Sequence, residues 1–541
     1  MLPAPSFLLA SNRNEHGPLP LLGVAALAWL AFAIGLHPLM LPDEGRYVGV
    51  AWEMARSGNW IVPTEDGLPF FHKPPLFYWL AALSIRTLGS SLAAARLTSV
   101  CAAWVAVIGL HGTVRRRVGA PLANATVLVL VTMPLFFGAA QYANLDILVA
   151  ACIALAVLFG ADAAIACRRH EPARRAILLA WTCAALGVLA KGLIGLVLPG
   201  LVLLIWLLAT GQSRTIPRLL WWPALALFAA ISAPWFIVVE SRYPHFANYF
   251  FVHHHFERFA GSGFNNVQPW WFFLVALPLL TMPWSLWLVR ARSRVGAADP
   301  ELRSLRTLMW AWLGVVVLFF SIPRSKPVGY ILPALFPLAF LVAEPVLAAW
   351  QTSRRQWLLA AGASALLATS VCIGGVAWLA TRYDRDHTAI ASTLRQLRAP
   401  DDSVVFVGDY FFDVPFLARL QAPVPVVADW RPERIAEGDN WRRELAEAGT
   451  FAPDKAGALL NGTLRSIPCG DGPLWVLAHV ADEAPLLSLP GATRVTQSHQ
   501  VGLWKVAGDT CRMASREPGA ALGADSAGDA NPRTLGGAHR Q

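Results

Sequence analysis

Long apolar runs separated by short polar segments occupy the first two thirds of the chain. Crossing a hydrocarbon core takes about 20 helical residues, and the pattern predicts about eleven such helices. The first run carries no charge and is too long and too weakly basic at its start for a cleaved signal peptide, so we expect a retained helix. The runs lie near residues 21–41, 93–113, 121–138, 145–166, 174–190, 192–209, 217–239, 269–290, 306–321, 328–349 and 355–381.

The charges between these runs predict one orientation. With a cytoplasmic N-terminus, every arginine cluster falls on the inner side, as the positive-inside rule requires. The amphipathic segment Leu76 to Leu88 fits this parity as an interfacial or partly re-entrant piece. The inner clusters are Arg115–Arg117, Arg168 to Arg175, Arg214 with Arg218, Arg290 to Arg294, and Arg354 with Arg355. The outer segments are 43–91, 141–146, the turn at Lys191, 240–268 and 324–330.

Composition supports a membrane protein and argues against a nucleic-acid-binding one. Of 541 residues, 56% are hydrophobic and 14% are charged, which is too apolar for one soluble core. The net charge of +10 arises from the short clusters between apolar runs and not from one basic face. We therefore expect an all-α polytopic membrane domain of about 11–13 transmembrane helices over residues 1–381, with outer loops 43–91 and 240–268.

The pattern changes after Ala380. DSVVFVGDY and APVPVVAD are typical of buried strands, and ERIAEGDNWRRELAEAG of a polar-faced helix. These segments predict a small soluble α/β domain over residues 382–514, periplasmic by parity, with a disordered tail at 515–541. Its two cysteines, Cys469 and Cys511, are expected to form a disulfide there. The remaining cysteines lie in or at the ends of apolar runs without metal-type spacing, and are expected to be inert.

Two carboxylates, Asp43 and Glu44, follow the first apolar run and open an amphipathic helix. Capping that helix would explain one carboxylate at its start, while a pair also suits catalysis. The same loop carries Lys73 between aromatic residues and a rigid diproline. A lysine at headgroup depth is often a snorkelling anchor, and the alternative is a cation that binds a lipid phosphate.

These segments resemble a known family. DEGRYVGVAWEMARSGNWIVP followed by LPFFHKPPLFYWL is similar to the first outer loop of bacterial aminoarabinose (4-amino-4-deoxy-L-arabinose) lipid A transferases. These enzymes group with protein O-mannosyltransferases in the lipid-linked GT-C superfamily. Further similar segments are ANLDILVA, GVLAKGLIGLVLPGL, HHHFERF and SIPRSKPVGYILPALFPLA, so that the resemblance covers roughly residues 20 to 350.

The resemblance implies roles for individual residues. Asp43, with Glu44 beside it, would be catalytic. Asp43 would act as a base for a hydroxyl acceptor, or orient an acceptor that is already anionic or the ammonium group of the sugar. The carrier phosphate would be bound by Lys73, Lys191, Arg258 and Tyr330, whose charges and hydroxyl stabilise the leaving group. Substrate contacts are expected from Arg46, Tyr47, Asp146 and Lys326, for which capping or headgroup anchoring is the alternative.

A metal is a weaker implication of the same resemblance. Some relatives bind a divalent ion through a histidine of the 250–259 loop and an acidic residue just before the phosphate-binding lysine. Here that second position is His72. A pair of His72 and His253 would favour zinc, while surface or phosphate-contact histidines are the main interpretation. No cofactor is required.

The function that follows is transfer of a sugar, with aminoarabinose as first choice, from undecaprenyl phosphate to lipid A at the periplasmic face of the bacterial inner membrane. The protein is expected to work as a monomer among membrane lipids. The nearest alternative is the same fold acting on protein or another glycan. A lipid-linked sugar transporter is the distant alternative, because its polar groups should lie at mid-membrane in repeated halves, whereas here they gather at one face.

Overall fold

The computed structural model describes residues 19–257, 266–291, 300–351, 355–438, 440–464, 472–487, 489 and 491–507. The chain divides into two compact units. The membrane unit comprises Met1–Thr64 and Phe70–Tyr383, and the sheet unit comprises Glu65–Pro69 and Asp384–Gln541. The predicted disulfide between Cys469 and Cys511 and the predicted tail lie outside the described residues.

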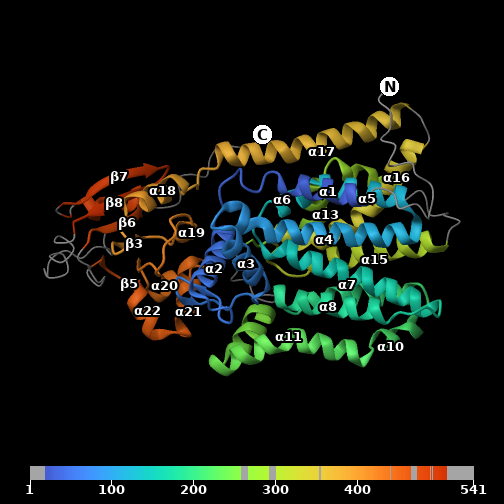
Figure 1. The fold of residues 1–541 in the computed structure, drawn as a ribbon, viewed down its shortest axis with the longest axis horizontal. Helices are drawn as coiled ribbons and strands as arrows, with labels where there is room; N and C mark the ends of the chain where they lie inside the picture. The colour runs from blue at the N-terminus through green and yellow to red at the C-terminus, as the bar shows by residue number, and fades with distance from the viewer. Residues whose placement is uncertain are drawn as a thin grey trace. The chain divides into compact units, whose positions relative to one another are not determined.

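The membrane unit is helical, and its long helices α4, α7 and α8 run side by side (Figure 1). Its α-helices are α1 Leu19–Ala31, α2 Asp43–Ser57, α3 Leu76–Leu88, α4 Leu92–Val118, α5 Ala120–Thr132, α6 Pro134–Ala140, α7 Leu145–Arg168, α8 Arg174–Lys191, α9 Ile194–Ala209, α10 Ile216–Leu219, α11 Trp222–Arg242, α13 Phe272–Leu280, α14 Leu288–Ala291, α15 Pro300–Ser321, α16 Leu335–Gln351 and α17 Arg355–Arg382. Short 3-10 helices are η2 Ser213–Thr215, η4 Trp284–Trp287 and η6 Val328–Ala334, and η3 Asn248–Glu257 is a π-helix.

Each of the eleven predicted apolar runs contains a helix or a bent pair of helices. Among the described residues, six helices are long and apolar enough to cross a membrane, or eight spans if each bent pair is one. The two pairs bend by 68° between α5 and α6 and by 106° between α13 and the 284–291 segment, where prolines interrupt the backbone hydrogen bonding. The chain is therefore a multi-pass membrane protein, and the number of crossings stays a prediction.

The first apolar run is shorter as a helix than predicted. α1 ends at Ala31, and the residues up to Pro42 form turns. Three backbone carbonyls of this turn region accept hydrogen bonds from Arg96, which compensates for the loss of helical hydrogen bonding there. This turn region leads directly into α2 and its two carboxylates.

The sheet unit contains a six-stranded sheet in the order β5-β4-β3-β6-β8-β7. Strands β5, β4, β3 and β6 are parallel, and β8 and β7 pair antiparallel at one edge. The strands are β3 Ser403–Val407, β4 Val426–Val427, β5 Leu460–Asn461, β6 Leu474–His479, β7 Thr493–Ser498 and β8 Val501–Val506. The helices are α18 Thr388–Leu397, α19 Val414–Leu417, α20 Pro432–Ile435, α21 Trp441–Thr450, α22 Pro453–Leu459, η8 Val480–Asp482 and α23 Ala484–Leu487.

Of two sequence predictions for the sheet unit, the one for strands is confirmed and the one for a single helix is wrong. The strands expected in DSVVFVGDY and APVPVVAD are confirmed as β3 and β4. The single helix expected after them is wrong, because the chain forms α20 and α21 with a break at Gly438, whose φ is +72°. Asn440 then caps α21 by accepting a hydrogen bond from the Arg443 amide. A left-handed glycine and a new N-cap end one helix and start the next.

A short hairpin in the first outer loop belongs to the sheet unit. Strands β1 Thr64–Glu65 and β2 Leu68–Pro69 form a two-stranded hairpin, and Glu65–Pro69 groups with the C-terminal residues. Asp66 is buried and accepts a 2.7 Å hydrogen bond from the Val424 amide. The loop that carries Asp43 and Lys73 thus also contributes to the second unit.

Candidate active site

Asp43 and Glu44 open α2 but face different surroundings. Successive residues of a helix point about 100° apart, so one carboxylate can face the core and the other solvent. The Asp43 side chain is 51% exposed and accepts a 2.9 Å hydrogen bond from Arg46. The Glu44 side chain is completely buried. Of the predicted catalytic pair, only Asp43 is open to a substrate in this arrangement.

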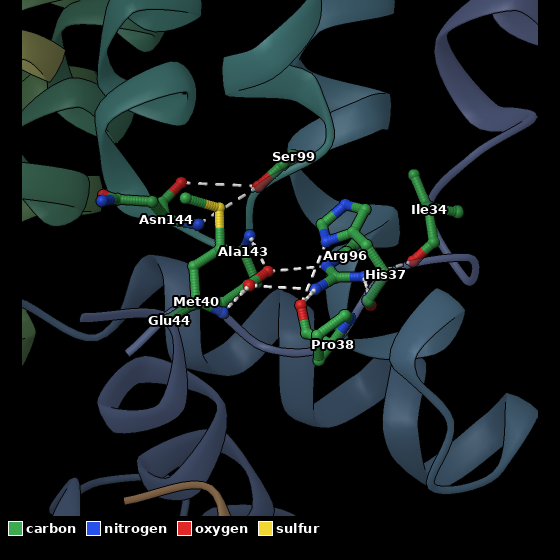
Figure 2. A network of polar contacts seen from close by, with 9 residues as sticks. All are labelled: Ile34, His37, Pro38, Met40, Glu44, Arg96, Ser99, Ala143 and Asn144. Atoms are coloured by element: carbon green, nitrogen blue, oxygen red, sulfur yellow. Dashed lines mark hydrogen bonds and ion pairs between the residues drawn. The ribbon is translucent and has the colours of Figure 1, made fainter. Parts of the chain in front are cut away.

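Glu44 lies at the centre of a buried polar network with Arg96 of α4 (Figure 2). Arg96 donates from Nε and Nη2 to the two Glu44 oxygens, at 2.6 and 2.9 Å. Both Glu44 oxygens also accept backbone amides, from Ala143 at 2.7 Å and from Met40 at 2.8 Å. The remaining Arg96 donors bind the backbone carbonyls of Ile34, His37 and Pro38.

Asp146 and Lys191 form an ion pair at one end of the helix bundle. Asp146 lies in the first turn of α7 and Lys191 is the last residue of α8, and both side chains are nearly buried. Each charge lies at the helix end that stabilises it, because a helix N-terminus stabilises an anion and a helix C-terminus stabilises a cation. Both residues were predicted for the site, and the structure brings them into direct contact.

Tyr330 of η6 packs against the lysine of this ion pair. The Lys191 ammonium nitrogen lies 4.1 Å from the centre of the Tyr330 ring, within the range of a cation–π contact. Gly329 packs so closely on Asp146 that a methyl group at its α-carbon would overlap the carboxylate. The sequence segment PVGYILP therefore supplies both the aromatic face and the space for the acid.

The turn at Lys191 depends on small residues. Gly192 has a φ of +83° and donates from its amide to the Val188 carbonyl, which ends α8. A side chain at Gly195 would overlap the backbone at Gly187, so α8 and α9 approach closely at this turn. Glycine allows both the left-handed turn and the close backbone contact.

Tyr142 lies near the candidate site residues and was not among those predicted from the sequence. It lies between α6 and α7, two residues before the Asn144 cap of α7. Burial, followed by the negative charges of Asp43, Glu44 and Asp146, raises the pKa of Tyr142 well above its usual value. The Tyr142 phenol is therefore neutral at neutral pH and lies close to these carboxylates. The sequence feature that could have identified Tyr142 is its position inside the predicted outer turn 141–146.

The remaining phosphate-side residues lie around the start of α3. Lys73 precedes α3 by three residues and is partly buried. His72 packs against Phe70, with ring centres 4.7 Å apart, and its ring centre lies 6.2 Å from that of Tyr249 in η3. The π-helix that carries His253 therefore approaches the Lys73 loop. Arg258 and the side chain of His253 lie outside the described part of the chain.

The other three predicted substrate-contact residues also have structural partners. Tyr47 is buried on α2, with ring centres 6.2 Å from Phe77 and 6.3 Å from Tyr78. Arg46 pairs with Asp43. Lys326 is 3% exposed, and its ammonium donates to the carbonyls of Gln268 and Pro323. These contacts favour packing for Tyr47 and loop bracing for Lys326.

The described side chains offer no metal site with three or more histidine, cysteine or acidic ligands. The approach of His72 to η3 leaves a site shared with His253 as a hypothesis.

The chain has the GT-C fold. The structure of ArnT from Cupriavidus metallidurans bound to undecaprenyl phosphate superimposes with a TM-score of 0.75 at 21% identity, and covers 90% of this chain and 97% of that one. Its apo structure gives the same TM-score at 20% identity, with 91% of this chain and 98% of that one covered. The fold class predicted from the sequence is confirmed.

Sequence relatives make the similarity more specific. An undecaprenyl phosphate-α-4-amino-4-deoxy-L-arabinose arabinosyl transferase of Pseudomonas fluorescens is 32% identical over 339 residues, which are 61% of this chain and 58% of the relative. The Pseudomonas aeruginosa transferase of the same name is 34% identical over 316 residues, 57% of this chain and 56% of the relative. A family described as dolichyl-phosphate-mannose-protein mannosyltransferase matches residues 72–238.

The alignments thus span less than two thirds of these relatives' length. The resemblance to aminoarabinose transferases that the motifs of the membrane part indicate is confirmed.

Proposed function

We propose that this protein transfers 4-amino-4-deoxy-L-arabinose from undecaprenyl phosphate to lipid A at the periplasmic face of the inner membrane. The observation that carries the proposal is the similarity to transferases of that name, at 32% and 34% identity. The contacts of Lys191 with Asp146 and Tyr330 support it, because all three residues lie in the motifs that resemble those transferases.

The chemistry is a displacement at the anomeric carbon of the sugar. An oxygen of the lipid A phosphate attacks that carbon from the side opposite the carrier, and the bond to the carrier phosphate oxygen breaks. The electron pair of that bond leaves with undecaprenyl phosphate. Since the attacking phosphate is already anionic at neutral pH, no base is needed for this acceptor.

The cationic residues act on the leaving group. Negative charge develops on the carrier phosphate as the bond breaks, and fixed cations stabilise that charge without reorganisation. The ammonium of Lys191 has three donors, so it can bind a phosphate oxygen while it keeps Asp146. Lys73 and Arg258 are proposed for the same phosphate, with the Tyr330 hydroxyl as a neutral donor.

Asp43 is proposed to act on the acceptor side. Its exposed carboxylate can bind the ammonium group of aminoarabinose or orient the lipid A headgroup. Arg46 holds one of the Asp43 oxygens at 2.9 Å and fixes the carboxylate at the start of α2. A substrate with an ammonium group would complete the coordination of this carboxylate.

A protein acceptor is the second candidate. The match of residues 72–238 to a family described by protein mannosylation favours it. With a serine or threonine hydroxyl, Asp43 would accept the hydroxyl proton as the carbon–oxygen bond forms.

Complementation tests the proposal and separates the two acceptors. The chain is expressed in a strain that lacks its own aminoarabinose transferase but makes the donor lipid, and lipid A is analysed by mass spectrometry. Restoration of the aminoarabinose adduct is expected. Folded protein with accumulated donor and unmodified lipid A would contradict the lipid A assignment, and glycosylated envelope protein would favour the second candidate.

A further inference from the structure

The Glu44–Arg96 pair joins parts of the membrane unit that are far apart in the sequence. Glu44 lies on α2, Arg96 on α4, and the Ala143 amide that Glu44 binds lies between α6 and α7. All five N–H groups of Arg96 are used, two toward Glu44 and three toward carbonyls of the turn after α1. Glu44 therefore has every contact that a buried carboxylate needs, and Arg96 has no free donor.

The segments held by this pair are those that carry the proposed acceptor side. Asp43 precedes Glu44 by one residue, so fixing Glu44 fixes the start of α2. Ala143 lies between Tyr142 and Asn144, and the Asn144 side chain caps α7 by accepting the Asp146 amide at 2.9 Å. Fixing the Ala143 amide therefore fixes the approach to Asp146.

Helix α4 supports the same segment from a second point. Ser99, three residues after Arg96 and thus on the same helix face, contacts Asn144 through its hydroxyl: the hydroxyl accepts the Asn144 amide at 3.4 Å and lies 3.5 Å from the Asn144 carbonyl oxygen. Figure 2 shows Arg96 and Ser99 side by side on α4, with Glu44 and Asn144 beside them. One face of α4 thus binds both the α2 start and the α7 start.

We propose that Glu44 and Arg96 are positioning residues that set the Asp43 carboxylate relative to the Tyr142–Asp146 segment for sugar transfer. This inference rests on the proposed function. The two adjacent carboxylates then have different roles. Asp43 contacts the substrate, and the buried Glu44 fixes the position of Asp43.

The burial of Glu44 argues against a direct chemical role. Its side chain is completely buried and each oxygen already accepts two hydrogen bonds. A general acid or base must reach the substrate within hydrogen-bond distance. A displacement of about 1 Å in an active site can nevertheless lower the rate about 100-fold. Loss of a residue that only holds Asp43 in position should therefore lower kcat measurably.

A matched pair elsewhere in the membrane unit separates positioning from stability. Arg306 of α15 donates to both oxygens of Glu344 on α16, and their side chains are also nearly buried. Arg169 just after α7 pairs with Glu301, about one turn before Arg306. The control pair therefore lies toward the C-terminal end of α7, and this end, at Arg168, is about 33 Å along the helix from Asp146.

The kinetic test compares Glu44→Gln, Arg96→Lys, the double variant and Glu344→Gln as purified full-length proteins with aminoarabinosyl undecaprenyl phosphate and lipid A. We expect kcat to fall about 30-fold or more in both single variants, with the donor KM within about threefold and an unchanged pH profile. The double variant should be no worse than the worse single variant. Glu344→Gln should keep kcat within about twofold.

Two kinetic results overturn the proposal. One is an unchanged kcat in folded Glu44→Gln. The other is a shifted pH–rate profile, which would make Glu44 an acid or base. If Glu44→Gln does not fold, Glu44→Asp keeps the charge and shortens the side chain by one methylene. That variant should lose about 10-fold in kcat, and full activity would overturn positioning.

Hydrogen exchange tests the pair without any transfer reaction. In Glu44→Ala, the Met40 and Ala143 amides lose their common acceptor, so peptides 36–47 and 140–147 should both exchange faster than in wild type and in Glu344→Ala. Faster exchange in peptide 36–47 alone would overturn the coupling. If the wild type transfers no aminoarabinose, the proposed function fails, while this exchange result still decides whether Glu44 joins the two segments.

Discussion

The ammonium nitrogen of Lys191 lies 4.1 Å from the centre of the Tyr330 ring, and the same ammonium pairs with Asp146. A cation at the end of α8 is thus held between an aromatic face and a carboxylate. Such a cation has a fixed place but keeps donors for an additional anion. This arrangement is the basis for assigning the carrier phosphate to the Lys191 end of the bundle.

Gly329→Ala should disable this cluster without touching a charged residue. The added methyl group would overlap the Asp146 carboxylate, so Asp146 must move and the Lys191 ammonium with it. We expect transfer to fall about 100-fold, as a displacement of about 1 Å in a site can do. The measurement is the initial rate of transfer by purified protein.

The control for Gly329→Ala is Gly314→Ala on α15, where an added methyl group meets no atom within 4 Å. Alanine has the higher helix propensity, so this variant should be fully active and at least as stable as wild type. Equal activity of both variants would show that the close approach of Gly329 to Asp146 has no role in transfer.

Tyr330→Phe and Tyr330→Leu separate the two uses of this side chain. Phenylalanine keeps the ring beside Lys191 but removes the hydroxyl, and a hydrogen bond to a charged group contributes about 1.5–3 kcal/mol. We expect donor binding about 10- to 100-fold weaker in Tyr330→Phe, and weaker still in Tyr330→Leu, which also loses the cation–π contact. Titration with undecaprenyl phosphate measures both, and unchanged affinity in Tyr330→Phe would remove the hydroxyl from the phosphate site.

Asp43→Asn should abolish the acceptor-side role while it preserves size and helix position. Loss of the charge should lower kcat about 100-fold or more, with undecaprenyl phosphate affinity unchanged because the carrier binds elsewhere. Glu171→Gln is the matched control, since its carboxylate is similarly exposed, 53% against 51%, and pairs with an arginine. A loss of carrier affinity in Asp43→Asn would place Asp43 on the phosphate side instead.

The sheet unit should lose part of its stability as pH rises. Burial alone lowers the pKa of His387, but the charge and the 2.9 Å hydrogen bond of buried Asp413 outweigh it, and the net direction is upward. A raised folded-state pKa stabilises the unit fully below the unfolded value of about 6.5, and this contribution fades as pH rises through the folded pKa. His387→Gln removes it.

Hydrogen exchange of α18 in the full chain measures this effect. The loss of protection caused by His387→Gln should be larger at pH 5.5 than at pH 9. The pKa of His479 is raised mainly by its hydrogen bond to Asp409, but the charge of His387 lowers it. The same comparison is therefore repeated in a His479→Gln background, where this coupling is absent. An equal loss at both pH values would mean that the protonated form of His387 contributes nothing.

The sequence motifs name candidate site residues but do not indicate their contacts. Asp146 and Lys191 were predicted from motifs 45 residues apart, and nothing in either motif indicated that they would pair. The place of Asp146 depends on Gly329, because only the absence of a side chain there lets the carboxylate fit. Such packing is a tertiary property and leaves no local sequence signal.

Glu44 shows the limit of local reasoning most clearly. Two adjacent acids at a helix start suit catalysis equally well by sequence, and their separation into an exposed Asp43 and a buried Glu44 depends on Arg96, 52 residues further along. The amphipathic patterns did predict the helices and two of the strands, because burial in lipid or in a sheet selects apolar residues locally. They missed the break between α20 and α21, which depends on one glycine turn and one asparagine cap.

The central claim is best tested by transfer in a purified system. Full-length protein is mixed with aminoarabinosyl undecaprenyl phosphate and lipid A, and both products are followed by mass spectrometry. The account predicts aminoarabinose-modified lipid A and free undecaprenyl phosphate in equal amounts, and neither product with Asp43→Asn. Wild-type protein that binds the donor but forms no modified lipid A, or equal product with Asp43→Asn, would contradict it.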